Sequence, residues 1–299
     1  MSDQNTHLEM VKKKKKRKKI LPYLMVLPTV IAYGMWCYYP FIRSIVLSLS
    51  VSTPKGEIKK WVWFANYVRL LKDKETWMMI RNTFEFAALI GVGTFIFAMC
   101  LSLLSVEKVK GSRVYQTMYA IPMAVSSIAV ANAFKQIYKK EGFLNAMLGT
   151  TTEWILKQDT AMGAVAAATI WCSIGASFLF LLVGFRNVPI DLLESSTVDG
   201  AGPIRRILNI LIPCASPQIF FVIFLNINGS FKNFVMIRQL TGGGPNNATM
   251  VLIYDVYLKA LNQGRFETAC AEALILCCII WIFQRIQFSC EKQIGRAHV

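Results

Sequence analysis

The sequence predicts an all-α membrane protein with six transmembrane helices. The chain has 299 residues, 55% of them hydrophobic, and a mean hydropathy of +0.44. That composition is too apolar for a soluble domain of this size. Six separate apolar runs are each long enough to cross about 30 Å of hydrocarbon, which takes roughly 20 helical residues. A polar segment, Val188–Pro213, interrupts the pattern between the fourth and fifth runs.

Each apolar run is expected to be helical because lipid offers no partners for backbone polar groups. The predicted spans are Leu21–Tyr39, Phe84–Ser105, Val114–Ile137, Met162–Gly184, Pro217–Ile237 and Phe266–Phe288. Four prolines are expected near span ends or in first turns, where a missing N–H is tolerated. These are Pro22, Pro28, Pro122 and Pro217. The span region therefore covers residues 21–290.

Residues 1–20 form a basic tail that contains eight consecutive basic residues, Lys12–Lys19, in a chain of net charge +16. The run leads directly into apolar sequence without interleaved aromatic residues. This pattern favours a cytoplasmic anchor on anionic membrane lipid and an orientation signal over a nucleic-acid-binding segment. It also resembles the basic region of a signal peptide, but the following apolar run is too long and no small-residue cleavage site follows.

An even number of spans leaves both termini on one side, and the basic tail predicts that this side is the cytoplasm. The polar segment between spans four and five is then cytoplasmic too. The short loop Val106–Arg113 carries Lys108, Lys110 and Arg113, which suits the same side. The longer loops Ser50–Ile80 and Lys139–Thr160 hold lysines as well, so the orientation depends mainly on the tail.

The polar segment is predicted to form two short helices around Gly200–Gly202. Asp191 is the expected N-cap of the first helix, with Glu194 at capping-box spacing. Pro203 suits the first turn of the second helix. In that helix, one apolar stripe is expected at helical spacing, with Arg205, Arg206 and Asn209 off it. The stripe comprises Ile204, Ile207, Leu208 and Leu211.

This segment resembles the EAA loop of ABC-importer permease subunits, whose pattern is E-A-A, three residues, G, nine residues, I-x-L-P. Matching residues are Glu194, Gly200, Ile210 and Pro213; Ser195 and Ser196 replace the alanines, and Ile212 replaces the leucine. Asp199–Ala201 matches the D-G-A of sugar-type members. The resemblance implies that separate ATPase subunits grip this segment. The implied coupling residues are Asp191, Leu192, Leu193, Glu194, Ser195, Ser196, Asp199, Gly200, Ala201 and Pro213.

Further stretches resemble sugar-type permeases of the maltose and glycerol-phosphate kind. They are Asn66–Asp73 with Arg81–Thr83, Phe143–Gly149, and Leu240–Pro245 with Thr249. The resemblance implies a bacterial plasma-membrane importer of a sugar, polyol or glycerol-phosphate solute. Its implied partners are a second permease subunit in a heterodimer, two cytoplasmic ATP-binding subunits and an extracytoplasmic solute-binding protein. Because no G-x-x-x-x-G-K-[ST] phosphate loop occurs in the sequence, the chain is expected to be non-catalytic, with ATP and Mg bound by the partners.

Span five is unusually polar, and Asn226, Ser230 and Asn233 are expected to share one helical face. Relatives that bind sugar within the membrane use positions in this span, just before the N-F-V seen here at Asn233–Val235. The resemblance makes these three residues solute candidates, with Trp171 and Ser173 of span four behind them. Amide and hydroxyl groups suit sugar hydroxyls, but the same groups commonly form helix–helix hydrogen bonds, and both interpretations remain open.

The remaining features are less specific. The eight cysteines lie in or beside predicted spans without a C-x-x-C pair, which favours buried thiols over a metal site. Glu85 and Glu272 fall at membrane depth, where pairing or closeness to the outer interface is expected rather than a proton relay. Residues 291–299 form a C-terminal tail. Its Gln293–Val299 resembles a translated sequencing adapter and is expected to be disordered.

Three other functions fit parts of the pattern. An ABC importer of a non-sugar solute would have the same coupling segment. A secondary transporter could have six spans and a polar midplane site, but such proteins often contain matched, interrupted halves, and no internal repeat is evident here. A membrane-anchored scaffold would explain the basic tail but not the polar face of span five. ATP dependence of uptake and copurification with a second permease and a solute-binding protein separate these alternatives.

Overall fold

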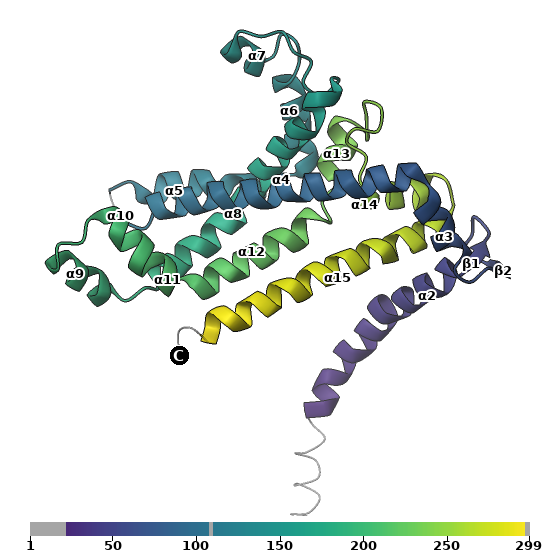
Figure 1. Ribbon diagram of the computed structural model, residues 1–299, viewed down its shortest axis with the longest axis horizontal. Coiled ribbons are helices and arrows are strands. Elements are labelled where there is room, and N and C mark those ends of the chain that lie inside the picture. Colours follow the sequence, from purple (N-terminus) through teal and green to yellow (C-terminus); the bar gives the residue numbers. More distant parts are fainter. Residues whose placement is uncertain (1–21, 108–109, 297–299) are drawn as a thin grey trace, which may run out of the picture.

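The computed structural model describes residues 22–107 and 110–296, with side chains up to residue 289. The described part is built mainly of helices, with one small hairpin (Figure 1). The basic run Lys12–Lys19 and the loop residue Lys108 lie outside the described residues. Their predicted roles therefore remain predictions.

The first helix runs from Pro22 to Ser48, past the predicted end at Tyr39. It contains a π-helical turn, η1 (Gly34–Tyr38), followed by α2 (Tyr39–Ser48). Its N-terminal part diverges from the rest of the molecule, and Trp36 is 75% exposed there (Figure 1). The C-terminal part of the helix packs against α15. Most of this apolar helix is thus unburied within the chain.

A short polar connection follows. Strands β1 (Ser50–Ser52) and β2 (Ile58–Trp61) form an antiparallel hairpin in which Ser50 is opposite Trp61. Helix α3 (Ala65–Lys72) leads to α4 (Lys74–Leu104), whose N-cap is Asp73. The Asp73 carboxylate accepts hydrogen bonds from the Glu75 N–H and the Thr76 hydroxyl, both at 3.2 Å. These bonds satisfy orphan donors at the start of a 31-residue helix.

Helices α4 and α8 (Gln158–Arg186) lie side by side at the centre of the molecule (Figure 1). Helix α4 contains the predicted span Phe84–Ser105 except for its last residue, Ser105. Helix α8 contains the predicted span Met162–Gly184. Small residues allow close approach along α8, where a Cβ on Gly175 would lie 3.2 Å from the carbonyl oxygens of Tyr119 and Ala120. The absence of that atom lets the C-terminal end of α5 (Ser112–Ala120) pack directly on α8.

The third predicted span, Val114–Ile137, is broken rather than continuous. It consists of α5 (Ser112–Ala120), a 3₁₀ turn η2 (Ile121–Ala124) and α6 (Ser127–Ile137), with a 102° bend. Pro122 lies in the first turn of η2, which agrees with the prediction that prolines lie in first turns or near span ends. The bend follows Ala124, where Val125 (ψ 139°) and Ser126 (ψ 129°) adopt extended backbone and interrupt the helix. Helix α7 (Phe143–Leu148) follows and ends at Gly149.

The fifth predicted span, Pro217–Ile237, is also wrong as a single helix. Helix α12 (Ser216–Ser230) ends in a turn, and a separate helix α13 (Val235–Leu240) follows. In the turn, the Lys232 N–H donates to the Gly229 carbonyl at 3.1 Å. A tightened final turn of this kind takes up carbonyls that would otherwise continue the α-helix.

Between α8 and α12 lie four short elements: α9 (Ile190–Val198), α10 (Pro203–Arg206), a π-helical turn η3 (Ile207–Leu211) and α11 (Ile212–Cys214). After α13 come α14 (Leu252–Tyr257), a π-helical turn η4 (Leu258–Asn262) and α15 (Phe266–Arg296). The expectation of disorder from Gln293 does not hold for residues 293–296, which continue α15. Residues 297–299 lie outside the described part.

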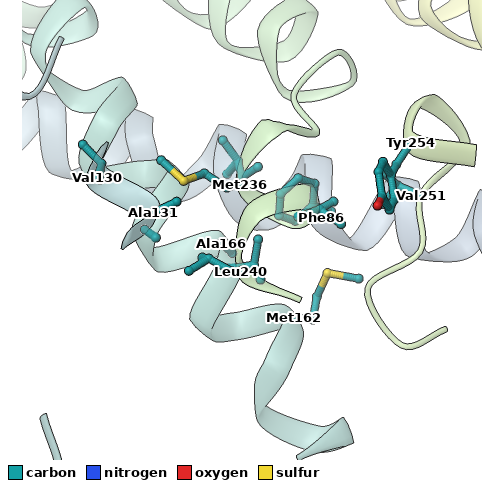
Figure 2. Packing of buried hydrophobic residues seen from close by; sticks show 13 residues of the cluster. Phe86, Val130, Ala131, Met162, Ala166, Met236, Leu240, Val251 and Tyr254 are labelled. Atoms are coloured by element: carbon teal, nitrogen blue, oxygen red, sulfur yellow. The ribbon is translucent and has the colours of Figure 1, made fainter. Parts of the chain in front are cut away.

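The core comprises three clusters of buried apolar residues. The cluster in Figure 2 joins α4, α6, α8, α13 and α14, and its labelled members are Phe86, Val130, Ala131, Met162, Ala166, Met236, Leu240, Val251 and Tyr254. A second cluster lies around Phe178 and Phe185 and includes Leu211 of η3. A third joins α4, α12 and α15 around Phe231. The broken elements α6 and α13 thus pack into the same core as the long helices.

Among the described residues, four helices are long and apolar enough to cross a membrane. They are Pro22–Ser48, Lys74–Leu104, Gln158–Arg186 and Phe266–Ser289. Two bent pairs pass the same test when taken together: Ser112–Ala124 with Ser127–Ile137, and Pro203–Cys214 with Ser216–Ser230. The number of candidate spans is therefore four, or up to six if each bent pair is one span.

Candidate functional site

The polar segment between α8 and α12 folds as two short helices around a glycine break, as predicted. Helix α9 ends in a Schellman motif: the Gly200 N–H donates to the Thr197 carbonyl at 3.1 Å and the Ala201 N–H to the Ser196 carbonyl at 2.9 Å. Gly200 has φ of +76°, which an L side chain rarely adopts. Pro203 lies in the first turn of α10, also as predicted.

The predicted N-cap of α9 is wrong. The helix begins at Ile190 with Pro189 in the cap position, and no side chain caps it. Asp191 instead lies in the first turn, where its charge is still favourable toward the helix dipole. Glu194 is exposed. Proline fixes a backbone angle suitable for entering a helix, so it starts α9 two residues earlier than the capping-box pattern predicts.

Helix α9 lies at one end of the molecule (Figure 1), and most of its polar and several of its apolar side chains are exposed. Asp191, Glu194, Ser195, Asp199 and Gly200 are exposed. Leu192 is 44% exposed, whereas Ser196 is buried, Leu193 and Ala201 are half-buried, and Leu193 packs against the second core cluster. The predicted coupling residues therefore divide into an outward face and a smaller inward face that holds the helix.

The apolar stripe predicted for the second helix is only partly correct. Ile207 and Leu211 pack against the second core cluster, but Ile204 is 73% exposed and Leu208 is 58% exposed. The cause is η3, because a π-helical turn has more residues per turn and rotates the stripe apart. Pro213, half-buried, lies within α11 at the approach to α12.

Arg206, which was predicted to lie off the apolar stripe of this helix, contacts α9. It is half-buried, and its Nη1 donates to Thr197 Oγ1 of α9 at 3.1 Å. A second arginine, Arg186, lies nearby at the end of α8. Its Nη2 donates to the Ser105 carbonyl at 2.9 Å, which satisfies a free carbonyl at the end of α4. Both arginines line a crevice between α9 and the ends of α4 and α8.

The predicted solute residues of span five do not share one face. Asn226 and Ser230 lie one turn apart on α12, where the Ser230 hydroxyl donates to the Asn226 carbonyl at 2.7 Å. Asn233 lies beyond the end of α12, in the turn before α13. The periodicity argument failed because it assumed an unbroken helix.

The Asn226 side chain bonds to α8 through a residue that the sequence prediction missed. Asn226 Oδ1 accepts a hydrogen bond from the Ser177 hydroxyl at 2.8 Å. Ser177 is one helical turn beyond Ser173, so it lies on the same side of α8 as that predicted solute candidate. Asn226 Nδ2 and Asn228 Oδ1 are buried without a partner among the described residues.

Trp171 and Ser173 of α8, the two further solute candidates, make a ring contact and a hydrogen bond, respectively, with groups outside α12. The Ser173 hydroxyl donates to the Thr169 carbonyl of its own helix at 2.9 Å. Trp171 is 39% exposed and packs against Phe134 of α6, with ring centroids 5.9 Å apart. Asn226 instead reaches a cavity of about 440 Å³ between α4, α12 and α15. Its other lining residues are apolar: Phe84, Ala87, Ala88, Gly91, Val92, Phe95, Ile223, Ile227, Phe231 and Phe283.

The glycine-rich stretch Leu240–Pro245 forms a compact turn that is tied to α4. Thr249 Oγ1 donates to the Gly244 carbonyl at 2.8 Å, and Asn82 Nδ2 donates to the carbonyls of Asn247 and Met250, both at 3.0 Å. The Leu252 N–H donates to Thr83 Oγ1 at 2.9 Å. Two of the family-like stretches, Arg81–Thr83 and this turn, thus meet in space, which their separation in the sequence concealed.

Two motif asparagines also serve backbone carbonyls. Asn66 Nδ2 donates to the carbonyls of Ser48 and Ser50 at 2.8 and 2.9 Å. Asn145 Nδ2 bonds in the same way to the carbonyls of Lys139, Lys140 and Thr152. Both side chains are buried. Their amides therefore shape loops rather than face a ligand.

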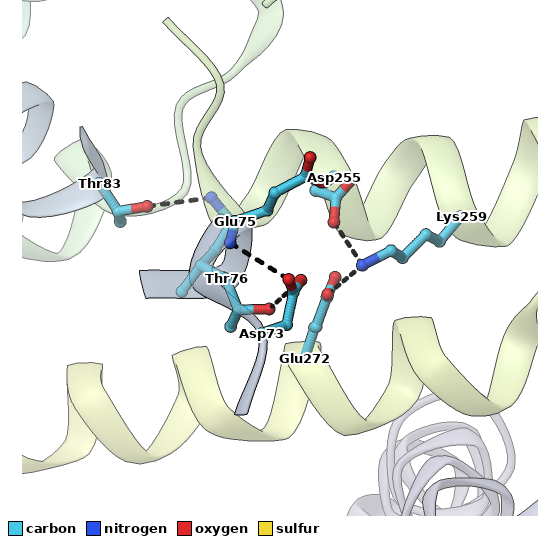
Figure 3. Close-up of polar contacts among 8 residues, drawn as sticks. Asp73, Glu75, Thr76, Thr83, Asp255, Lys259 and Glu272 are labelled. Atoms are coloured by element: carbon cyan, nitrogen blue, oxygen red, sulfur yellow. Dashed lines mark hydrogen bonds and ion pairs between the residues drawn. The ribbon is translucent and has the colours of Figure 1, made fainter. Parts of the chain in front are cut away.

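A buried charge cluster joins η4 to α15 (Figure 3). Lys259 Nζ lies 2.6 Å from Asp255 Oδ2 and also contacts Glu272 Oε1. Glu272 is fully buried, and its ion pair with Lys259 confirms pairing, one of the two situations predicted for it. Glu85 is exposed on α4. Burial lowers the pKa of Lys259, but its bonds to the two carboxylates outweigh this and raise that pKa, so the side chain is an ammonium at neutral pH.

The described cysteines are free: Cys37, Cys100, Cys172, Cys214, Cys270, Cys277 and Cys278. The sequence predicted buried thiols, but several of these cysteines are exposed on the surface of the single chain. Within residues 22–107 and 110–296, no group of three or more His, Cys, Asp or Glu side chains is arranged to hold a metal ion.

Comparisons with known proteins bear on this arrangement. A family model described as binding-protein-dependent transport system inner membrane component matches residues 106–294. The sn-glycerol-3-phosphate transport system permease protein UgpA of Yersinia pestis is 31% identical over 274 residues, covering 90% of this chain and 92% of that protein. The protein of the same name from Salmonella typhi is 29% identical over 277 residues, covering 91% and 94%.

Solved structures share the fold. A bacterial ABC transporter involved in the import of the acidic polysaccharide alginate contains a chain that matches with a TM-score of 0.81, at 21% identity, over 95% of this chain and 98% of that chain. A chain of the MetNI methionine ABC transporter matches with a TM-score of 0.55, at 14% identity, over 75% and 99%. Together with the family match, these findings show that the chain belongs to the binding-protein-dependent transport system inner membrane components.

Proposed function

We propose that this chain is the non-catalytic transmembrane permease subunit of an ATP-driven importer for a sugar or a related polyol or glycerol-phosphate solute. The observation that carries the proposal is the exposed segment Ile190–Pro213 between α8 and α12. It lies at one end of the molecule (Figure 1), and it exposes carboxylates and apolar side chains beside a glycine break. Exposed apolar groups of this kind mark contact sites for other proteins.

The proposed topology has six spans, with each bent helix pair counted as one. Both termini and the coupling segment then lie in the cytoplasm, and the turns around α7 and α14 lie outside. The bend of 102° between Ala124 and Ser127 and the bend of 73° before α12 occur within these pairs. Breaks in membrane helices are tolerated where neighbouring protein satisfies the freed backbone groups.

The proposed partners are two cytoplasmic ATP-binding subunits, a second permease subunit, an extracytoplasmic solute-binding protein and membrane lipid. ATP and Mg would bind to the ATPase subunits, and this chain would transmit their movement. The helix Pro22–Ser48 supports a heterodimer embedded in lipid, because most of its apolar surface is uncovered within the chain.

The solute class rests on the relatives named for sn-glycerol 3-phosphate and on the amide and hydroxyl groups of α12. Asn226 has one buried amide donor without a partner among the described residues, and Ser230 lies one turn away. These groups remain our candidates for the solute pathway. The apolar cavity beside Asn226 favours the alternative of a less polar, non-sugar solute for the same importer class.

ATP-dependent uptake tests the proposal. The complete importer would be placed in proteoliposomes with radiolabelled sn-glycerol 3-phosphate and maltose as probes. Glu194→Ala and Gly200→Val should abolish copurification of the ATPase subunits and uptake, while membrane insertion is retained. Glu153→Ala, another exposed glutamate outside the segment, is the matched control. Uptake driven by an ion gradient without ATP would instead indicate a secondary transporter.

A further inference from the structure

Arg206 makes a side-chain bond across the glycine break of the coupling segment. Its Nη1 donates to Thr197 Oγ1, which joins the end of α10 to the last turn of α9. The neighbouring Arg205 is exposed and has no such bond among the described residues. Backbone bonds close the end of α9 itself, but Gly200 and Gly202 leave the connection to α10 flexible. The Arg206 guanidinium is therefore well placed to set the angle between α9 and α10.

Arg206 also lies between two cavities that together form a crevice under the coupling segment. One has a volume of about 310 Å³ and the other about 610 Å³. Four residues line both cavities: Val106, Glu107, Leu193 and Arg206. The crevice thus separates the coupling segment from the end of α4. Two of the shared residues carry opposite charges: Glu107 follows the end of α4, and Arg206 is the last residue of α10.

The guanidinium of Arg206 is incompletely satisfied in this arrangement. Its Nε is buried without an acceptor among the described residues, and no described carboxylate lies within 4.0 Å of it as an ion pair. A buried N–H of a charged group without a partner carries a desolvation cost. An arrangement in which the crevice narrows would relieve that cost, and Glu107 is the carboxylate that shares both cavities with Arg206.

We propose that Arg206 is a positioning residue of the coupling segment: it holds α9 at a fixed angle to α10 and pairs with Glu107 when the crevice narrows. Movement of α9 would then reach the end of α4 directly, in addition to passing along η3 and α11 into α12. This inference rests on the proposed function of the segment as the contact for ATPase subunits. It adds a second route by which their movement enters the bundle.

The test uses the complete importer in lipid nanodiscs, with MgATP alone as the probe. Hydrogen–deuterium exchange of α9 would be followed by mass spectrometry, with and without vanadate to trap the closed ATPase. Arg206→Ala should raise exchange in α9 by about fivefold or more, and Thr197→Val should do the same. Arg205→Ala is the matched control and should leave exchange unchanged. Equal exchange in Arg205→Ala and Arg206→Ala would overturn the positioning role.

The Glu107 pairing has a separate test. Glu107→Arg and Arg206→Glu should each raise MgATP hydrolysis in the absence of solute, and the double variant should restore the low rate of the native importer. Additive effects of the two substitutions would contradict the pair, because groups that never interact do not rescue one another. If the tests of Arg206 fail while Glu194→Ala and Gly200→Val still release the ATPase subunits, only the role of Arg206 is wrong. If they do not, the proposed function itself is wrong.

Discussion

Two polar regions lie at opposite ends of the long helices (Figure 1), and they differ in whether their polar side chains have bonding partners within the chain. In the region after α12, which runs from Thr241 to Lys259, buried side chains bond to carbonyls, hydroxyls or opposite charges. In the coupling segment, Ile190–Pro213, the carboxylates are exposed and unpaired among the described residues. Both regions are rich in glycine and polar residues, so composition alone does not distinguish them.

The difference shows what each region contributes. A polar group that is buried and satisfied specifies the fold, because removing its partner leaves an uncompensated group. A polar group that is exposed and unpaired contributes little to folding and remains available for another protein. Substitutions should therefore lower stability in the first region and interfere with partner binding in the second. The following substitutions test that division.

The largest loss of stability is expected from Lys259→Met. The substitution would leave Asp255 and the fully buried Glu272 facing each other without the ammonium between them. Breaking a buried ion pair from one side costs about 3–5 kcal/mol. Thermal unfolding of the purified protein in detergent would measure the loss. Glu85→Gln, at an exposed glutamate of α4, is the control and should leave the midpoint unchanged.

Asn82→Ala should cost less, about 1–3 kcal/mol, because it leaves the carbonyls of Asn247 and Met250 without their donor. The same thermal unfolding assay applies, with the adjacent exposed Arg81→Ala as control. Hydrogen exchange should rise in the turn around Gly243 but not in α9. A stability loss equal to that of Arg81→Ala would contradict the view that this turn is held by the asparagine.

Gly200→Ala should have a small effect on stability and a large effect on partner binding. A Cβ at Gly200 meets no atom within 4 Å, but its φ of +76° costs an L residue about 1–2 kcal/mol. The strain should displace the end of α9 and weaken the copurification of ATPase subunits. Gly202→Ala is the matched control, because Gly202 has ordinary φ of −67° and open space around it. Equal binding by the two variants would contradict a docking role for this turn.

Sequence reasoning located elements wherever the information was local. The apolar runs identified α4, α8 and α15, and the glycine and proline spacing identified the break between α9 and α10. It failed where a long apolar run conceals an interruption. Around Val125 the flanking sequence is largely apolar, so hydropathy alone favours one continuous helix, whereas packing of η2 and α6 against α8 stabilises the bend. After Ser230, Asn233 was assigned to the polar face of a continuous helix, although α12 ends at Ser230.

Contacts between distant residues were the other limit. The hydrogen bond from Asn82 to Asn247 joins positions that are 165 residues apart, and no local sequence pattern at either position predicts the contact. The same holds for Lys259, whose pairing with Glu272 depends on the fold of η4. The apolar stripe of the second helix was partly mispredicted for a local reason, since a π-helical turn begins at Ile207 and hydrophobic periodicity assumes an α-helix.

The smallest expected effect concerns the link between α8 and α12, which belongs to neither region. Ser177→Ala removes the hydroxyl that donates to Asn226 Oδ1 and should cost about 0.6 kcal/mol, as is common for hydrogen bonds between membrane helices. Ser173→Ala is the matched control, because that hydroxyl bonds to a carbonyl of its own helix. Thermal unfolding would compare the two.

Uptake by the same two variants decides what Asn226 does. If the amide only joins the helices, the uptake rate should fall only as far as the stability of each variant falls, and Ser177→Ala should transport almost normally. If the amide binds solute, losing its partner frees Oδ1 and lets the side chain turn, so the KM for the radiolabelled solute should change while the melting temperature barely moves. Asn226→Ala should then shift KM further, and Ser173→Ala should not shift it. A KM that is unchanged in all three variants would assign the polar face of α12 to packing and move the search for the solute pathway to other helices.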